Sequence, residues 1–155
     1  MHVMQAKLDW FVRNGGVELA EAHMAECLPL TAEEGEVQAV DWGTYTSLEE
    51  AECLLLVVVL DDVHNILGYV VGSATPSIHN KGKFDFSTTA FYTVPEHRGT
   101  GVAKMLFEAL VRKCKEVGIS DINYSVSEAY PDAHKTMQSF GMTHTESMYS
   151  FRIKE

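Results

Sequence analysis

Residues 93–103 place a glycine-containing turn between a run of β-prone residues and a long amphipathic helix; they read Thr-Val-Pro-Glu-His-Arg-Gly-Thr-Gly-Val-Ala. Such a turn directs backbone N–H groups outward at the positive end of a helix dipole, which suits a pyrophosphate. A bulky side chain at Gly99 or Gly101 would obstruct that approach, and Arg98 adds a fixed positive charge. The alternative interpretation is a strand-to-helix turn that binds nothing.

The helix after this turn has a clear apolar period. Its C-terminal turns are rich in Lys and Arg, and Gly118 follows them, as expected where a helix ends. We therefore predict a helix from residue 102 to about 117 with one face in the core. Its apolar positions, at i, i+3, i+4 and i+7 spacing, are Val102, Met105, Leu106, Ala109, Leu110 and Val117.

The first third of the chain predicts two helices before any strand. A short first helix and a longer second one are separated by the break Asn14-Gly15-Gly16. The first contains Met4, Leu8, Phe11 and Val12, and the second contains Val17, Ala20, Met24, Cys27 and Leu28.

The remaining segments predict a sheet. Three β-rich runs, 53–60, 66–74 and 84–94, precede the main helix, and the first two flank a loop of hairpin length at 61–65. After the main helix we expect a strand over 119–126 and a helix over 131–140 that Gly141 stops. Alternating Tyr149, Phe151 and Ile153 predict a final strand.

Length and composition favour one compact α/β domain spanning residues 1–155, because 46% of the residues are hydrophobic and 22% are charged. The longest apolar run, 53–60, is far shorter than the roughly 20 residues that cross a bilayer. Three cysteines have neither metal nor redox spacing, which favours free thiols. We expect a soluble, cytoplasmic protein, either a monomer or a homodimer, with no membrane partner.

The formal net charge of −10 argues against a nucleic-acid partner, because phosphate binding needs clustered Lys and Arg. An acidic body instead favours a cationic substrate such as an amine. No Gly-x-Ser-x-Gly or His-Glu-x-x-His sequence is present, so hydrolases and zinc proteases have little support.

The turn closely resembles the acetyl-CoA signature of the GCN5-related N-acetyltransferases, Gln/Arg-x-x-Gly-x-Gly/Ala. Arg98, Gly101 and Ala103 occupy its three defined positions. The resemblance implies an α/β fold with a mixed, mostly antiparallel central sheet and helices on both faces. It also implies that the strands before and after the main helix splay apart to admit acetyl-CoA.

Carried onto this sequence, the resemblance implies that acetyl-CoA is the cosubstrate. Strand residues Tyr92, Thr93 and Val94 would pair with its pantetheine amides. The pyrophosphate would lie on the turn formed by Arg98, Gly99, Thr100, Gly101, Val102 and Ala103. The acceptor would be a primary amine of a small molecule or a protein, which attacks the thioester directly while a backbone N–H stabilises the oxyanion.

Two departures from the family pattern concern the catalytic acid and base. Met137 occupies the position where a Tyr commonly protonates the leaving thiolate, and a thioether cannot donate a proton. Tyr130 is the nearest candidate for that role, or else a packing aromatic. Residues 86–90 contain no carboxylate to serve as general base. His79 could accept the proton or could simply be solvated, and Asp85 is a further alternative, as is Glu128.

The N-terminal half contains a second group of candidate residues. His23 and Glu26 lie at i, i+3, which fits a hydrogen-bonded pair, half of a metal site or an ordinary polar face; we predict no metal. Trp42 and Tyr45, on an expected turn after Asp41, could wall an amine pocket or pack the first helices on the sheet. Asp85 is expected to contact the amine as well.

These N-terminal residues, together with Pro76-x-x-His79, are similar to acetyltransferase-like proteins of tailed bacteriophages. The sequence thus leaves two classes of function open. One is an N-acetyltransferase, which the signature turn favours. The other is a catalytically weak or inactive module of the same fold that binds a partner protein, which the missing acid and base favour.

Overall fold

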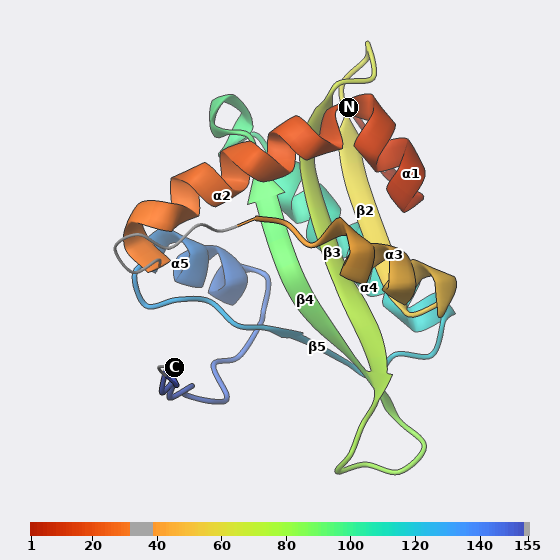
Figure 1. Ribbon diagram of the computed structural model, residues 1–155, viewed down its shortest axis with the longest axis vertical. Helices are drawn as coiled ribbons and strands as arrows, with labels where there is room; N and C mark the ends of the chain where they lie inside the picture. The colour runs from red at the N-terminus through yellow and green to blue at the C-terminus, as the bar shows by residue number, and fades with distance from the viewer. Residues whose placement is uncertain (32–38, 154–155) are drawn as a thin grey trace. The chain divides into compact units, whose positions relative to one another are not determined.

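The computed structural model describes residues 1–31 and 39–153 (Figure 1). The chain forms two compact units, Met1–Ser125 and Val126–Glu155. The first unit holds the sheet and most of the helices, and the second holds the last helix. A single domain over residues 1–155 stays a prediction. No helix in these two described stretches is long and apolar enough to cross a membrane.

The first unit is built on a five-stranded sheet with the order β1-β2-β3-β4-β5. The first four strands pair antiparallel with their neighbours, and β5 pairs parallel with β4. This mixed, mostly antiparallel sheet confirms the predicted fold class. The strands are β1 (His2–Gln5), β2 (Leu54–Leu60), β3 (Ile66–Pro76), β4 (Phe84–Thr93) and β5 (Asp121–Tyr124).

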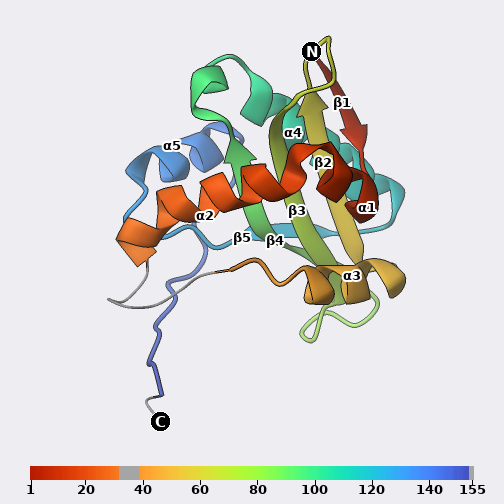
Figure 2. The same cartoon turned by 45° about the horizontal axis from the view of Figure 1, so that its top comes forward.

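Helices cover both faces of this sheet, as Figures 1 and 2 show. On one face lie α1 (Leu8–Phe11), α2 (Val17–Thr31) and α3 (Trp42–Glu50), with a π-helical turn, Val12–Gly16, between the first two. The other face is covered by α4 (Val102–Glu116), which follows a 3-10 turn at Pro95–His97. The predicted main helix and its end at Gly118, where φ is +82°, are confirmed.

The apolar strand β2 supplies both cores because its side chains alternate between the two faces. Leu55, Val57 and Val59 join the core beneath α4. Leu56, Val58 and Leu60 join the core beneath α1, α2 and α3. A continuous apolar run is therefore required here, since neither face of this strand meets water.

The start of the chain differs from the prediction. Met4 lies in strand β1 and pairs with Val58, whereas a helix was expected. The reason is tertiary, because the edge of β2 offers these residues backbone partners that a short isolated helix lacks. The break at residues 14–16 is confirmed, since Asn14 and Gly15 have non-helical backbone angles. Asp41 begins helix α3 and not a turn, and its carboxylate accepts hydrogen bonds from Thr44 N and Oγ1.

The second unit, described to residue 153, contains α5 (Pro131–Ser139), followed by Gly141 with φ +84°. Residues 142–153 form neither helix nor strand, so the predicted final strand is wrong. The side chains of Tyr149, Phe151 and Ile153 are 95%, 91% and 84% exposed. Alternation produces a strand only where a neighbouring strand pairs with it and its apolar face is covered, and this segment has neither. Strand β5 is also shorter than the expected 119–126.

Candidate functional site

The turn between β4 and α4 has a backbone that only glycine adopts without strain. Gly99 has φ +79° and Gly101 has φ +94°, and a Cβ at either position would point into open space. Gly101 precedes α4 and has no side chain with which to cap it. The first N–H groups of α4 have no acceptor within the helix, so they point out of its N-terminus. This is the geometry that binds an anion.

Strand β4 presents an open edge that leads into this turn. Its pairing with β5 runs from Asp85↔Asp121 to Thr88↔Tyr124, whereas β4 continues to Thr93. Val94 N donates to Leu67 O on the β3 side, 3.0 Å away. Because backbone groups alternate along a strand, those of Thr93 face the opposite edge. The two strands therefore part before β4 ends, as the splayed pair requires.

Arg98 is held by residues of two other elements. Its guanidinium forms a bidentate ion pair with Glu26 of α2, with both N···O distances 2.7 Å. Its Nε donates to Thr93 O at 3.0 Å, and its Cζ lies 5.5 Å from the centre of the Tyr92 ring. These hydrogen bonds lower the pKa of Glu26 and raise that of Arg98. The arginine charge is thus paired, and the side chain fixes the turn to α2.

His23 packs beside this ion pair. Its Nδ1 lies 2.8 Å from the Tyr69 hydroxyl, and its ring stacks on Tyr92 with centroids 4.5 Å apart. Burial is the main cause of a lowered pKa for His23, which keeps the imidazole neutral near pH 7, and burial raises the pKa of Tyr69. His23 and Glu26 thus bond to other residues and not to each other. Among residues 1–31 and 39–153, no group of three or more His, Cys, Asp or Glu could hold a metal ion.

A cavity of about 280 Å³ lies on the same face of the sheet. Two of the sequence-predicted substrate residues, Trp42 and Tyr45 of α3, line it together. Strands β2, β3 and β4 form its floor with Leu56, Tyr69, Val71, Thr89 and Ala90, and helices α1 and α2 complete its walls with Leu8, Phe11, Ala20 and Met24.

Thr89, at the floor of the cavity, sits in a β-bulge. Val71 pairs with Ala90 and Gly72 with Thr88, so Thr89 is the extra residue of β4. Its Oγ1 donates to Val71 O at 3.2 Å and lies 2.8 Å from the Tyr45 hydroxyl. Bulges often redirect a side chain next to an active site. The bulge brings the α3 wall of the cavity into contact with the strand that leads to the glycine turn.

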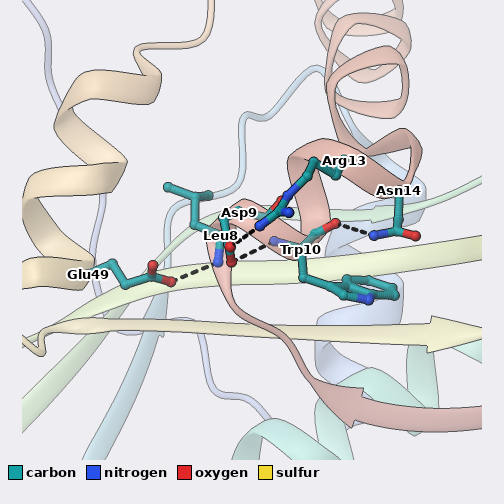
Figure 3. Close-up of polar contacts among 6 residues, drawn as sticks. All are labelled: Leu8, Asp9, Trp10, Arg13, Asn14 and Glu49. Atoms are coloured by element: carbon teal, nitrogen blue, oxygen red, sulfur yellow. Dashed lines mark hydrogen bonds and ion pairs between the residues drawn. The ribbon is translucent and has the colours of Figure 1, made fainter.

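One hydrogen bond joins the walls formed by α1 and α3, and Figure 3 shows it together with the polar contacts within residues 9–14. Glu49 of α3 accepts a hydrogen bond from Leu8 N at the start of α1, 2.7 Å away. This carboxylate satisfies one of the exposed N–H groups of a helix whose own N-cap residue, Lys7, supplies no side-chain bond. At the other end of α1, Asn14 Nδ2 donates to Trp10 O at 2.7 Å, and Arg13 pairs with Asp9.

Two other sequence-predicted residues of the first unit, Asp85 and His79, lie away from this cavity. Asp85 pairs with Thr75 and Asp121 at the far end of β4, and His79 lies exposed in the loop between β3 and β4. Neither is among the residues that line the cavity. Tyr130 belongs to the second unit, where it precedes α5 and donates its backbone N–H to Ser127 O at 3.0 Å. Met137 is a buried residue of that helix.

Sequence reasoning missed Tyr69 and Thr89. Tyr69 lies within an apolar run that predicts only a buried strand, and Thr89 acquires its position from a bulge that no nearby glycine or proline marks on β4. One signal could have identified Tyr69: it places a polar hydroxyl in an otherwise apolar strand, and such a group needs a buried hydrogen-bond partner.

Comparison with known proteins identifies a matching family and several structures of the same fold. The model of the acetyltransferase (GNAT) family matches residues 17–142. No curated protein sequence matches the chain.

Solved structures with the same fold include an aminoglycoside acetyltransferase from an uncultured soil metagenomic sample, in complex with sisomicin. It is 14% identical, with TM-score 0.74 over 99% of this chain and 95% of that one. A ribosomal-protein-alanine N-acetyltransferase from Brucella melitensis biovar Abortus 2308 is 18% identical, with TM-score 0.71 over 99% and 100%. AAC(6')-Iy, in complex with the bisubstrate analog CoA-S-monomethyl-acetylneamine, is 17% identical, with TM-score 0.73 over 99% and 97%.

Proposed function

The chain belongs to the acetyltransferase (GNAT) family, and we propose that it transfers the acetyl group of acetyl-CoA to a primary amine. Members of this family use acetyl-CoA, and one structural relative is in complex with a CoA analog. The observation that carries the proposal is the glycine turn at the N-terminus of α4 beside the open edge of β4. This edge also borders the cavity through Thr89 and Ala90.

The cofactor would be held mainly by backbone groups. The N–H groups of Gly99, Gly101, Val102 and Ala103 would bind the pyrophosphate, since glycine at 99 and 101 leaves room for it, whereas the N–H of Thr100 donates to His97 O. Of Tyr92, Thr93 and Val94, only Thr93 has backbone groups at the open edge, and its N–H would pair with the pantetheine because its carbonyl already accepts from Arg98. Arg98 would act indirectly, because its guanidinium is engaged by Glu26 and Thr93. When bound, acetyl-CoA supplies a thioester carbonyl that an amine can attack.

The chain's contribution to the reaction would be chiefly orientation. Trp42 and Tyr45 would hold the acceptor next to the bulge of β4, and well-oriented reactants need less catalytic assistance. Tyr130 would donate a proton to the leaving thiolate. The Tyr130→Phe variant, which lacks the hydroxyl, should therefore have a lower rate of acetyl transfer. The exposed loop position of His79 does not support its role as proton acceptor. An unchanged rate of acetyl transfer in His79→Ala would exclude that role.

A module that binds a partner protein is the second candidate function. The observation that favours it is the exposure of Met148, Tyr149, Phe151 and Ile153, each of which is at least 76% exposed. An apolar surface of this kind commonly marks an interaction site. Under this alternative, acetyl-CoA would bind without being turned over. Similarity to bacteriophage proteins, a cytoplasmic location and the oligomeric state stay predictions.

Calorimetry with acetyl-CoA and with desulfo-CoA tests the proposal first. We expect both to bind the wild type and neither to bind Gly101→Glu, because the new side chain puts bulk and negative charge on the anion site. Gly118→Glu is the matched control, since Gly118 also has a positive φ, +82°, and a Cβ added there would meet no atom within 4 Å, but it lies at the other end of α4. In each variant the left-handed backbone costs about 1–2 kcal/mol of stability.

Both variants strain the backbone, but only Gly101→Glu also alters the proposed anion site. Equal acetyl-CoA affinity in Gly101→Glu and Gly118→Glu would refute the assignment of the turn. Selective loss in Gly101→Glu supports it. CoA release with an amine, measured next, then distinguishes a transferase from a binding module.

A further inference from the structure

We infer that the cavity beneath α1, α2 and α3 accepts a compact primary amine with an apolar body and no anionic group. The inference rests on the proposed acetyl transfer and narrows its acceptor.

The walls are suited to an apolar body. Phe11, Met24, Leu56 and Val71 contribute hydrocarbon surface from four different elements. An acceptor rich in hydroxyl groups would bury several of them without partners, and each such loss costs about 1–3 kcal/mol. The volume of about 280 Å³ lies just below the range of about 300–1,000 Å³ typical of pockets for drug-sized ligands. The cavity therefore fits a small apolar molecule better than a large polyol.

The charge of the lining selects the amine and rejects an acid. Among the lining residues that the structure describes, Asp41 is the one charged side chain, and none is Lys, Arg or His. Hydrogen bonds from Thr44 lower the pKa of Asp41, so its carboxylate is ionised at neutral pH. An ammonium is attracted to it, and a carboxylate or phosphate on the acceptor would find no counter-charge. The rings of Trp42 and Tyr45, with centroids 6.2 Å apart, also favour a cation.

The hydroxyl of Tyr45 supplies a directed acceptor for the amine. Thr89 has a single hydroxyl proton and donates it to Val71 O. The 2.8 Å contact between Tyr45 and Thr89 must therefore have Tyr45 as donor. The remaining lone pairs of the Tyr45 oxygen are left to accept an N–H group. This oxygen lies beside the bulge of β4, so an amine bound to it would be next to the open strand edge.

The first test compares three acceptors in an assay of CoA release. The acceptors are 2-phenylethylamine, L-phenylalanine, which adds a carboxylate to the same skeleton, and glucosamine, which replaces the apolar body with a polyol. We expect kcat/KM for phenylethylamine to exceed that for either of the others by at least about tenfold, the effect of one unpaired buried polar group. A preference for phenylalanine or glucosamine would overturn the inference.

A binding measurement makes the test independent of catalysis. The chain has two tryptophans, Trp10 and Trp42, and Trp10 does not line the cavity. In Trp10→Phe, emission therefore reports on Trp42 alone. We expect saturable changes on titration with phenylethylamine, and an affinity about three- to tenfold lower when Tyr45→Phe is added, from one lost hydrogen bond. Tyr149→Phe, a change of the same kind at an exposed residue, should leave the affinity unchanged.

The outcomes separate this inference from the proposed function. If acetyl-CoA fails to bind in calorimetry, acetyl transfer itself is refuted. If acetyl-CoA binds but phenylethylamine leaves Trp42 emission unchanged, the acceptor class is wrong and the proposed function stands. An equal loss of affinity in Tyr45→Phe and Tyr149→Phe would exclude the assigned role of the Tyr45 oxygen.

Discussion

The two faces of the sheet are made by the same strands yet differ in what they contain. The face beneath α4 is filled by aliphatic side chains, together with Phe86 and Cys114. The face beneath α1, α2 and α3 contains aromatic rings and hydroxyl groups, including Tyr69 and Tyr92, and it includes the cavity.

The helices explain much of this difference. Leu106 and Leu110 of α4 are almost completely buried against the sheet, and Gly68 lets α4 approach so closely that a Cβ there would lie 2.9 Å from Val102. On the opposite face, α2 presents the small Ala20 to the cavity. The comparison teaches that one face supplies stability by close packing, whereas the other packs less closely and leaves a cavity.

The largest expected difference concerns Leu→Ala substitutions on the two faces. Leu106→Ala should lower the free energy of unfolding by about 2–5 kcal/mol, because Leu106 is fully enclosed. Leu56→Ala should cost less, since Leu56 already borders the cavity and has fewer neighbours to lose. Urea unfolding of both variants measures the difference. A greater loss in Leu56→Ala would break the comparison.

A matched pair of Ala→Met substitutions should have opposite effects. Ala109→Met adds volume to the filled face and should destabilise the fold by about 1–3 kcal/mol. Ala20→Met adds the same volume to the cavity, where filling can stabilise by about 0.5–2 kcal/mol. We expect Ala20→Met to bind phenylethylamine much more weakly. Thermal unfolding and Trp42 emission measure the two effects. A similar destabilisation in both variants would contradict the proposed difference in packing between the two faces of the sheet.

The ion pair on the cavity face should contribute little to stability. Glu26→Gln is expected to cost about 0.2–1 kcal/mol, because both partners are more than 40% exposed. Its effect should fall instead on acetyl-CoA affinity, through the turn that Arg98 holds. Glu116→Gln, which removes the acidic partner of Lys113 on α4, is the control and should leave that affinity unchanged. Calorimetry and urea unfolding of the two variants check both statements.

The smallest expected effect is a pH dependence from His23. Its folded pKa is lowered, chiefly by burial and also by Arg98, while Glu26 acts in the opposite direction. The unfolded state therefore binds the proton more readily. The contribution of His23 to the free energy of unfolding should be fully present above about pH 6.5, the pKa of histidine in the unfolded chain. It should decrease as the pH falls toward the lowered pKa of the folded state. Unfolding at pH 8 and at pH 5.5 should show a smaller decrease in His23→Gln than in the wild type; an identical decrease would refute this role.

Several elements could be predicted from the sequence because they depend on local periodicity. The strands β2, β3 and β4, helix α4 and the glycine turn were each marked by an apolar pattern or by a required backbone angle. Strand β1 and the end of the chain could not be predicted in this way. The backbone partners of Met4 lie more than 50 residues away on β2, and the alternation of Tyr149, Phe151 and Ile153 carries no information about whether a neighbouring strand exists.

For the site, the sequence by itself determined that the turn resembles an acetyl-CoA signature and that Trp42 and Tyr45 are candidate pocket residues. Only the tertiary structure decided that Tyr45 meets Thr89, that His23 meets Tyr69 across 46 positions and that Arg98 meets Glu26 across 72. The physical reason is that a turn's backbone conformation is fixed by its own few residues. A cavity and its hydrogen-bond partners are fixed only when separate elements pack on one sheet.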